Sequence, residues 1–98
     1  GKLTVSGTSV IDRIDAPSPV NAVIIIESGA KVKLFNVDQY SPSYAPNIKI
    51  DAGAIIETLD LHSIAKTTKL TIDPTANITK IIHNGNEYTS VADFLASL

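Results

Sequence analysis

Three acidic residues follow short apolar runs at matching points of the chain. Glu27, Asp51 and Asp73 lie 24 and 22 residues apart. If the segments that carry them stack in register, neighbouring carboxylates lie about 5 Å apart. That spacing is near the separation of the two carboxylates in a retaining glycosidase, and carboxylate oxygens are also ligands for Ca²⁺. The simpler interpretation is that short acidic residues make exposed turns, so we expect no resident metal or cofactor.

A second group of residues favours ligand binding over catalysis. Tyr40, Tyr44 and Gln39 lie in a Ser- and Pro-rich segment, residues 38–46. Tyrosine offers an apolar ring and a hydroxyl, a combination common in sugar- and protein-binding sites, although one ring could equally pack on its own fold. His62 and His83 follow or end equivalent segments and could approach each other, but two surface histidines without a chemical role fit equally well.

Composition excludes several classes of function. The chain has no cysteine, a net charge of −2 and only eight basic residues, so we expect no thiolate chemistry and no nucleic-acid partner. The longest apolar run, residues 22–26, is too short to insert into a membrane. No serine lies in a nucleophile-elbow context, and no glycine-rich phosphate loop is present. The chain is therefore interpreted as non-enzymatic, without excluding an enzyme.

The residues above are positioned by a repeat. Four ungapped stretches align, residues 3–16, 24–37, 48–61 and 70–83, with offsets of 21, 24 and 22 residues. Each begins with two alternating apolar residues, then a turn, a small residue, and three further apolar positions. A period near 22 residues is typical of a solenoid, in which each unit buries its apolar face against the next.

Alternation within each unit predicts strands, and Ile (14) and Val (7) favour them. We interpret each unit as three short strands that pair in parallel with their counterparts in the next unit. The predicted fold is therefore all-β, a short parallel β-helix of about four coils over residues 1–83. A leucine-rich-repeat-like solenoid and a β-sandwich are the alternatives.

Residues 84–98 leave the pattern. Asn84-Gly85 is a strong hairpin signal, and residues 87–89 fit a short return strand. Ser90 and Asp93 resemble a helix N-cap with an acid at the third position, and Val91, Phe94, Leu95 and Leu98 share one helical face. The sequence predicts an amphipathic helix that caps the last coil. Because Gly1 replaces an initiator Met and the first coil has no matching cap, we expect a piece of a longer chain.

The stretches at residues 23–37 and 47–61 resemble coils of the parallel β-helices of bacteriophage tailspikes and tail fibres and of bacterial surface adhesins. The resemblance covers about residues 2–83 and rests on a degenerate coil pattern. It implies a trimeric, rod-like part of a virion or cell surface that binds a receptor or glycan. The exposed apolar positions Ile25 and Ile55 agree with packing on neighbouring chains.

The function expected from this sequence is a non-enzymatic structural and receptor- or glycan-binding segment, with Tyr40, Tyr44 and Gln39 as the candidate ligand contacts. Glu27, Asp51 and Asp73 remain weaker candidates for Ca²⁺ or for catalysis. The alternatives are a polysaccharide-cleaving lyase or hydrolase that uses those three carboxylates, and a purely structural spacer. Expected partners are further copies of the chain, as a trimer, and a surface glycan.

Overall fold

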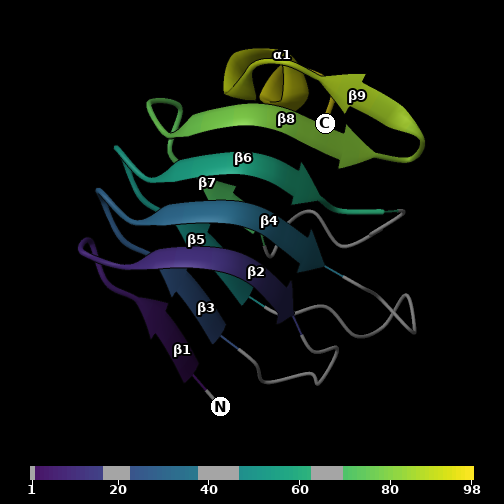
Figure 1. Ribbon diagram of the computed structural model, residues 1–98. Helices are drawn as coiled ribbons and strands as arrows, with labels where there is room; N and C mark the ends of the chain where they lie inside the picture. The colour runs from purple at the N-terminus through teal and green to yellow at the C-terminus, as the bar shows by residue number, and fades with distance from the viewer. Residues whose placement is uncertain (1, 17–22, 38–46, 63–69) are drawn as a thin grey trace.

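The structure is a computed structural model, and it describes residues 2–16, 23–37, 47–62 and 70–98. Strands in these ranges form two sheets, and one short helix follows them (Figure 1). The elements, in chain order, are β1 (Lys2–Val5), β2 (Val10–Ala16), β3 (Val23–Ile26), β4 (Lys31–Val37), β5 (Asn47–Ile50), β6 (Ile55–Asp60), β7 (Leu70–Ile72), β8 (Asn77–His83), β9 (Asn86–Tyr88) and α1 (Val91–Ala96).

Each repeat contributes one strand to each sheet. The first sheet has the order β1-β3-β5-β7, all parallel, and the second has the order β2-β4-β6-β8-β9, in which only β9 is antiparallel. Leu3 pairs with Ile24, Ile24 with Ile48, and Ile48 with Leu70. This register confirms the alignment of the four sequence stretches and the parallel pairing predicted from it.

The predicted parallel β-helix with three strands per turn is wrong. Each repeat has two strands, because the presumed second and third strands form one bent strand. In β2 the bend lies at Asp12 and Arg13, two consecutive exposed residues between the inward-facing Ile11 and Ile14. The Cα extents of 32 × 30 × 20 Å describe a compact domain, where the tailspike-like resemblance implied a rod.

Neither alternative fold describes the molecule. A leucine-rich repeat adds a helix or 3₁₀ segment to each strand, whereas the helix seen in the described ranges lies at the C-terminal end. A β-sandwich is built of antiparallel sheets, whereas the four-stranded sheet here is entirely parallel. The structure is a small, mostly-β domain of two sheets with a short C-terminal helix.

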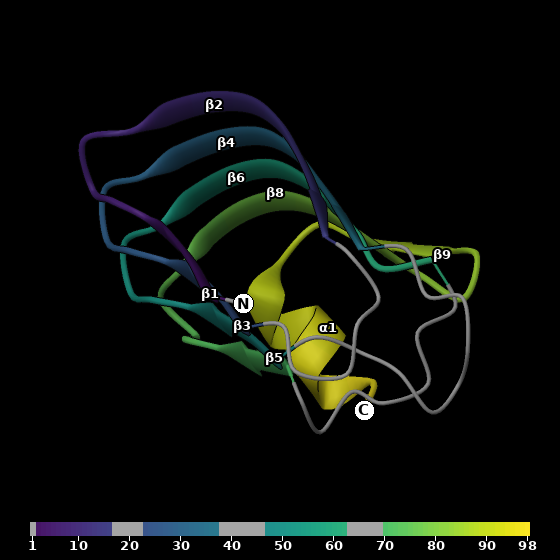
Figure 2. The same cartoon turned by 90° about the horizontal axis from the view of Figure 1, so that it is seen from below.

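The core lies between the two sheets, which are joined along one side by short turns (Figure 2). Aligned aliphatic residues fill it from repeat to repeat: Ile26 lies beside Ile50, and Phe35 beside Leu59. The small residue after each turn is also buried, with Ala30 and Ala54 fully so. Branched aliphatics and alanines therefore account for the composition, because the interior between the sheets is narrow.

The C-terminal segment closes one end of this core as the sequence predicts. Asn84 and Gly85 both have positive φ and connect β8 to β9 in a two-residue hairpin. Ser90 caps α1, and its Oγ accepts a hydrogen bond from the Asp93 N–H at 3.0 Å. Phe94 is fully buried and meets the rings of His83 and Tyr88 edge-on, at 5.7 and 5.5 Å between centroids. The helix lies beyond β8 in Figure 1.

Candidate functional site

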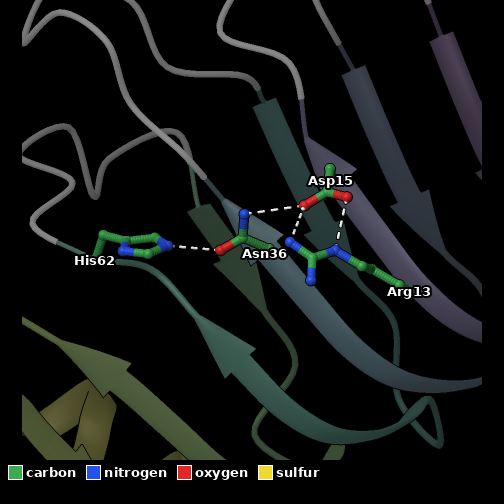
Figure 3. A network of polar contacts seen from close by, with 4 residues as sticks. All are labelled: Arg13, Asp15, Asn36 and His62. Atoms are coloured by element: carbon green, nitrogen blue, oxygen red, sulfur yellow. Dashed lines mark hydrogen bonds and ion pairs between the residues drawn. The ribbon is translucent and has the colours of Figure 1, made fainter.

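A network of polar side chains crosses three parallel strands on the outer face of the five-stranded sheet (Figure 3). Asp15 of β2, Asn36 of β4 and Asp60 of β6 are register partners, so the backbone ladder holds them side by side. They alternate with buried neighbours, because successive side chains of a strand point to opposite faces. The strand pairing thus aligns three polar side chains in one row.

Asp15 is the centre of the network. Arg13 donates to it through Nε, 2.8 Å from Oδ2, and through Nη2, 2.9 Å from Oδ1. Asn36 donates from the other side, with Nδ2 3.0 Å from Oδ1 of Asp15. These bonds lower the pKa of Asp15, Arg13 contributing more than Asn36, and they raise the pKa of Arg13. Both charged side chains of the pair are 57% exposed, so water screens their attraction.

His62 extends the network beyond β6. Its Nε2 lies 2.5 Å from Oδ1 of Asn36. Since the Asn36 amide nitrogen already donates to Asp15, its oxygen is the acceptor, and His62 Nε2 must carry the proton. The His62 backbone is left-handed, with φ of 50°. It is held by Asp60, whose Oδ1 accepts from the His62 N–H at 3.0 Å, and by the Asn84 N–H, which donates to the His62 carbonyl at 2.6 Å.

The network lies at the point where three connections leave the sheet. Asp15, Asn36 and His62 are each within two residues of the segments 17–22, 38–46 and 63–69, which lie outside the described ranges. Tyr40, Tyr44 and Gln39, the predicted ligand contacts, fall in the second of these segments and so lie outside the described residues. Gln39 follows Asn36 by three residues in sequence.

The acidic residues of the turns occupy equivalent positions in successive repeats, and the carboxylates of Asp51 and Asp73 make local contacts. The backbone N–H groups of Glu27, Asp51 and Asp73 donate to Val5, Ile26 and Ile50 of the preceding repeat, at 2.9–3.0 Å. The Asp51 carboxylate lies 3.7 Å from the Lys49 ammonium. Asp73 accepts from the N–H and hydroxyl of Thr75, at 2.8 and 2.6 Å.

The hydrogen bonds from Thr75 lower the pKa of Asp73. A general acid needs a raised pKa to hold its proton near neutrality, so Asp73 is poorly suited to that role. Within residues 2–16, 23–37, 47–62 and 70–98, no group of three His, Cys, Asp or Glu side chains is placed to hold a metal ion. The role of Glu27, Asp51 and Asp73 in Ca²⁺ binding or catalysis stays a prediction.

The two histidines do not form a site together. His83 faces the core and packs against Phe94, whereas the His62 side chain is 44% exposed and turns toward Asn36. His83 continues the inward row of Ala16, Val37 and Leu61, and His62 is one residue beyond it. The two side chains therefore point to opposite faces of the sheet.

Sequence reasoning missed the network because it followed the apolar rows. The signal was present in the same alignment: position 13 of the first three stretches is Asp15, Asn36 and Asp60, all polar. Arg13 lies two residues before Asp15 on β2 and forms an ion pair with it. Reading the polar column of the aligned stretches would have identified Asp15, Asn36 and Asp60, three of the five residues.

A shallow groove accompanies the network on the same sheet. It is lined by side chains at the first half of β2, β4 and β6, among them Val10, Asp12, Lys31, Lys33 and Glu57. The groove and the network lie on the same three adjacent strands, and the groove is lined by both apolar and charged side chains. In the described part of the chain, no helix is long and apolar enough to cross a bilayer.

Comparison with known proteins gives no relative from which a role could be transferred. The predicted resemblance to tailspikes, tail fibres and surface adhesins, with the trimer it implied, has no support in these comparisons, and the two-sheet fold contradicts its structural basis. No family model, no curated protein and no solved structure matches this chain.

Proposed function

We propose that this protein is a non-enzymatic glycan-binding module whose binding surface is centred on Arg13, Asp15, Asn36 and His62. The observation that carries the proposal is the hydrogen-bonded row of these side chains, which runs from β2 over β4 to His62, just beyond the end of β6. Each is oriented by its neighbour, so little side-chain entropy remains to be lost when a ligand binds.

The chemistry of the row suits a ligand rich in hydroxyl groups. A guanidinium has five N–H donors, of which Arg13 uses two on Asp15. Carboxylate and amide oxygens accept more than one hydrogen bond, so Asp15 and Asn36 retain capacity for a ligand. Sugar hydroxyls both donate and accept, and they match such a mixed surface. The tyrosines of residues 38–46 are candidate stacking partners for a sugar ring.

The network favours binding over cleavage. The pKa of Asp15 is lowered by Arg13 and Asn36, so the carboxylate is ionised and unsuited to protonate a leaving group. The proposed role is therefore recognition by a preformed surface. A surface that meets glycans fits the extracellular or virion location expected from the sequence, which stays a prediction.

The proposal is tested by screening the purified chain against an array of surface glycans and titrating hits in ¹H–¹⁵N NMR spectra. We expect shifts at the Asn36 side-chain amide and the Arg13 Nε–H, and about tenfold weaker binding in Asn36→Ala, the loss of one to two hydrogen bonds. Thr71→Ala, an exposed change on the other sheet, is the matched control. Binding that is equal in both variants would assign the ligand to another surface, and a purely structural spacer would bind none.

A further inference from the structure

One end of the molecule presents two edge strands. Among the described residues, β1 pairs only with β3 and β2 only with β4, whereas β9 and α1 lie beyond β8 at the opposite end (Figure 1). Two large apolar side chains are exposed on these edge strands, Leu3 at 47% and Val10 at 77%. An open edge offers unpaired backbone groups to another strand.

The backbone of β2 is oriented for such pairing. The Lys31 N–H donates to the Ser9 carbonyl at 3.0 Å, so Lys31 turns its backbone groups toward β2. In a parallel pair, the register partner then turns its own groups the other way. Val10 is that partner, and its N–H and carbonyl therefore face the open side.

The side chains of β2 follow a pattern that reads the same in both directions. From Val10 to Asp15 the residues face out, in, out, out, in and out, with the bend at Asp12 and Arg13 as the centre. A second copy that lies antiparallel about a two-fold axis at this centre matches the pattern at every position. Ile11 then lies opposite the partner's Ile14, both directed toward the cores.

Charge agrees with this register. Asp12 lies opposite the partner's Arg13, and Arg13 lies opposite the partner's Asp12, so the two-fold axis generates two attractive pairs. Opposite charges directly across an antiparallel pair stabilise it, and like charges oppose it. Arg13 keeps its bonds to its own Asp15, because a guanidinium has donors to spare.

We propose that two copies of this chain associate through their β2 edges, antiparallel, with the two-fold axis between Asp12 and Arg13. The partner is a second copy because the edge is complementary to itself in both side-chain direction and charge. Head-to-tail association of β2 with the β8 edge of another copy is opposed, since β9 already pairs with β8. The two glycan-binding rows would then lie on one joined sheet.

Sedimentation equilibrium of the full chain, from micromolar to millimolar concentration, tests this proposal. We expect a monomer–dimer equilibrium, and a dissociation constant raised about tenfold or more in Asp12→Lys, which places like charges opposite each other twice. Glu57→Lys is the matched control, since it makes the same charge change at the equivalent position of β6, an interior strand, and we expect it to leave the dissociation constant unchanged.

A charge swap separates loss of the interface from loss of the fold. Asp12→Lys combined with Arg13→Asp restores opposite charges across the two-fold axis, so dimerisation should recover relative to Asp12→Lys alone. A monomer at all concentrations, a trimer, or a dimer equally affected by Asp12→Lys and Glu57→Lys would overturn the proposal.

Discussion

The carboxylate of Asp15 accepts hydrogen bonds from Arg13 on its own strand and from Asn36 on the next. Both stabilise the charged form, so its pKa in the folded protein lies below its ordinary value. A carboxyl of this kind contributes stability above its unfolded pKa, about 3.9, and the contribution is lost as the pH falls through the lower folded pKa.

Replacing Arg13 tests this assignment. In Arg13→Gln the pKa of Asp15 should rise toward its ordinary value, and in Asn36→Ala it should rise less, because Arg13 makes the larger contribution. Carboxyl ¹³C chemical shifts followed through an acid titration measure both. The pKa of Asp73, set by Thr75, should not change in either variant. A larger shift in Asn36→Ala would contradict the order of the two contributions.

At the residue scale, the sequence could predict which positions share a row but not how their side chains join. Asp15, Asn36 and Asp60 follow from the alignment, since the register is that of the apolar residues beside them. The hydrogen bond from His62 to Asn36 depends on the left-handed backbone of His62, one residue beyond the inward row. No repeat pattern carries that information.

At the scale of elements, the turn between the two strands of a repeat is made by close backbone contact and left-handed φ. Gly29 and Gly53 have φ of 85° and 78°, values that favour glycine. A Cβ at Gly29 would also lie 2.9 Å from the Gly7 carbonyl oxygen of the preceding repeat. Stacking repeats thus constrain the turn twice, through its conformation and through its neighbour.

Comparing alanine at two glycines separates these constraints. Gly85 has φ of 77°, but a Cβ added there would meet no atom within 4 Å, whereas a Cβ at Gly29 meets the Gly7 carbonyl. Gly85→Ala should therefore cost about 1–2 kcal/mol for the backbone alone, and Gly29→Ala measurably more. Urea denaturation of both variants gives the two free energies of unfolding. Equal decreases in the free energy of unfolding would show that the turn at Gly7 moves to accommodate the added Cβ without measurable destabilisation.

The C-terminal helix is too short to be stable alone, so its formation depends on Phe94. That ring is fully buried between His83 and Tyr88, and Phe94→Ala should destabilise the protein by about 3–5 kcal/mol. Leu98, 57% exposed and two residues beyond the end of the helix, is the control, and Leu98→Ala should change stability by about 0.5 kcal/mol or less. Thermal unfolding followed by circular dichroism distinguishes them. A small loss in Phe94→Ala would mean that the helix does not close the core.

The sequence predicted the helix and hairpin well because their signals are local: a cap residue, an Asn-Gly pair and a helical face. It predicted the wrong number of strands because Ile11 and Ile14, three residues apart, fit two short strands as well as one bent strand. Only pairing with β4 over Val10–Ala16 distinguishes the two cases. A bend within one strand and a turn between two strands give the same spacing of apolar residues in the sequence.

At the scale of the whole molecule, each strand of the four repeats pairs with its counterpart in the adjoining repeat. Each repeat is therefore stabilised by the repeats beside it, and the two ends of the five-stranded sheet differ in what covers them. Among the described residues, β3 to β6 and β8 are paired on both sides, whereas β1, β2, β7 and β9 are paired on one side, and α1 packs against β8 and β9. In the five-stranded sheet β9 and α1 support β8, so β2 should be the less stable end of that sheet.

Amide hydrogen exchange tests this gradient and its dependence on concentration. In dilute solution the amides of Thr4 and Val10, which face the open side, should exchange about a hundredfold faster or more than those of β4 and β5. At millimolar concentration the Val10 amide should become protected in the unsubstituted chain but not in Asp12→Lys, because the partner's β2 then accepts its hydrogen bond. Protection of Val10 in dilute solution would mean that its N–H already has a partner within one chain. Protection in Asp12→Lys at high concentration would show that the charges across the two-fold axis do not determine the pairing.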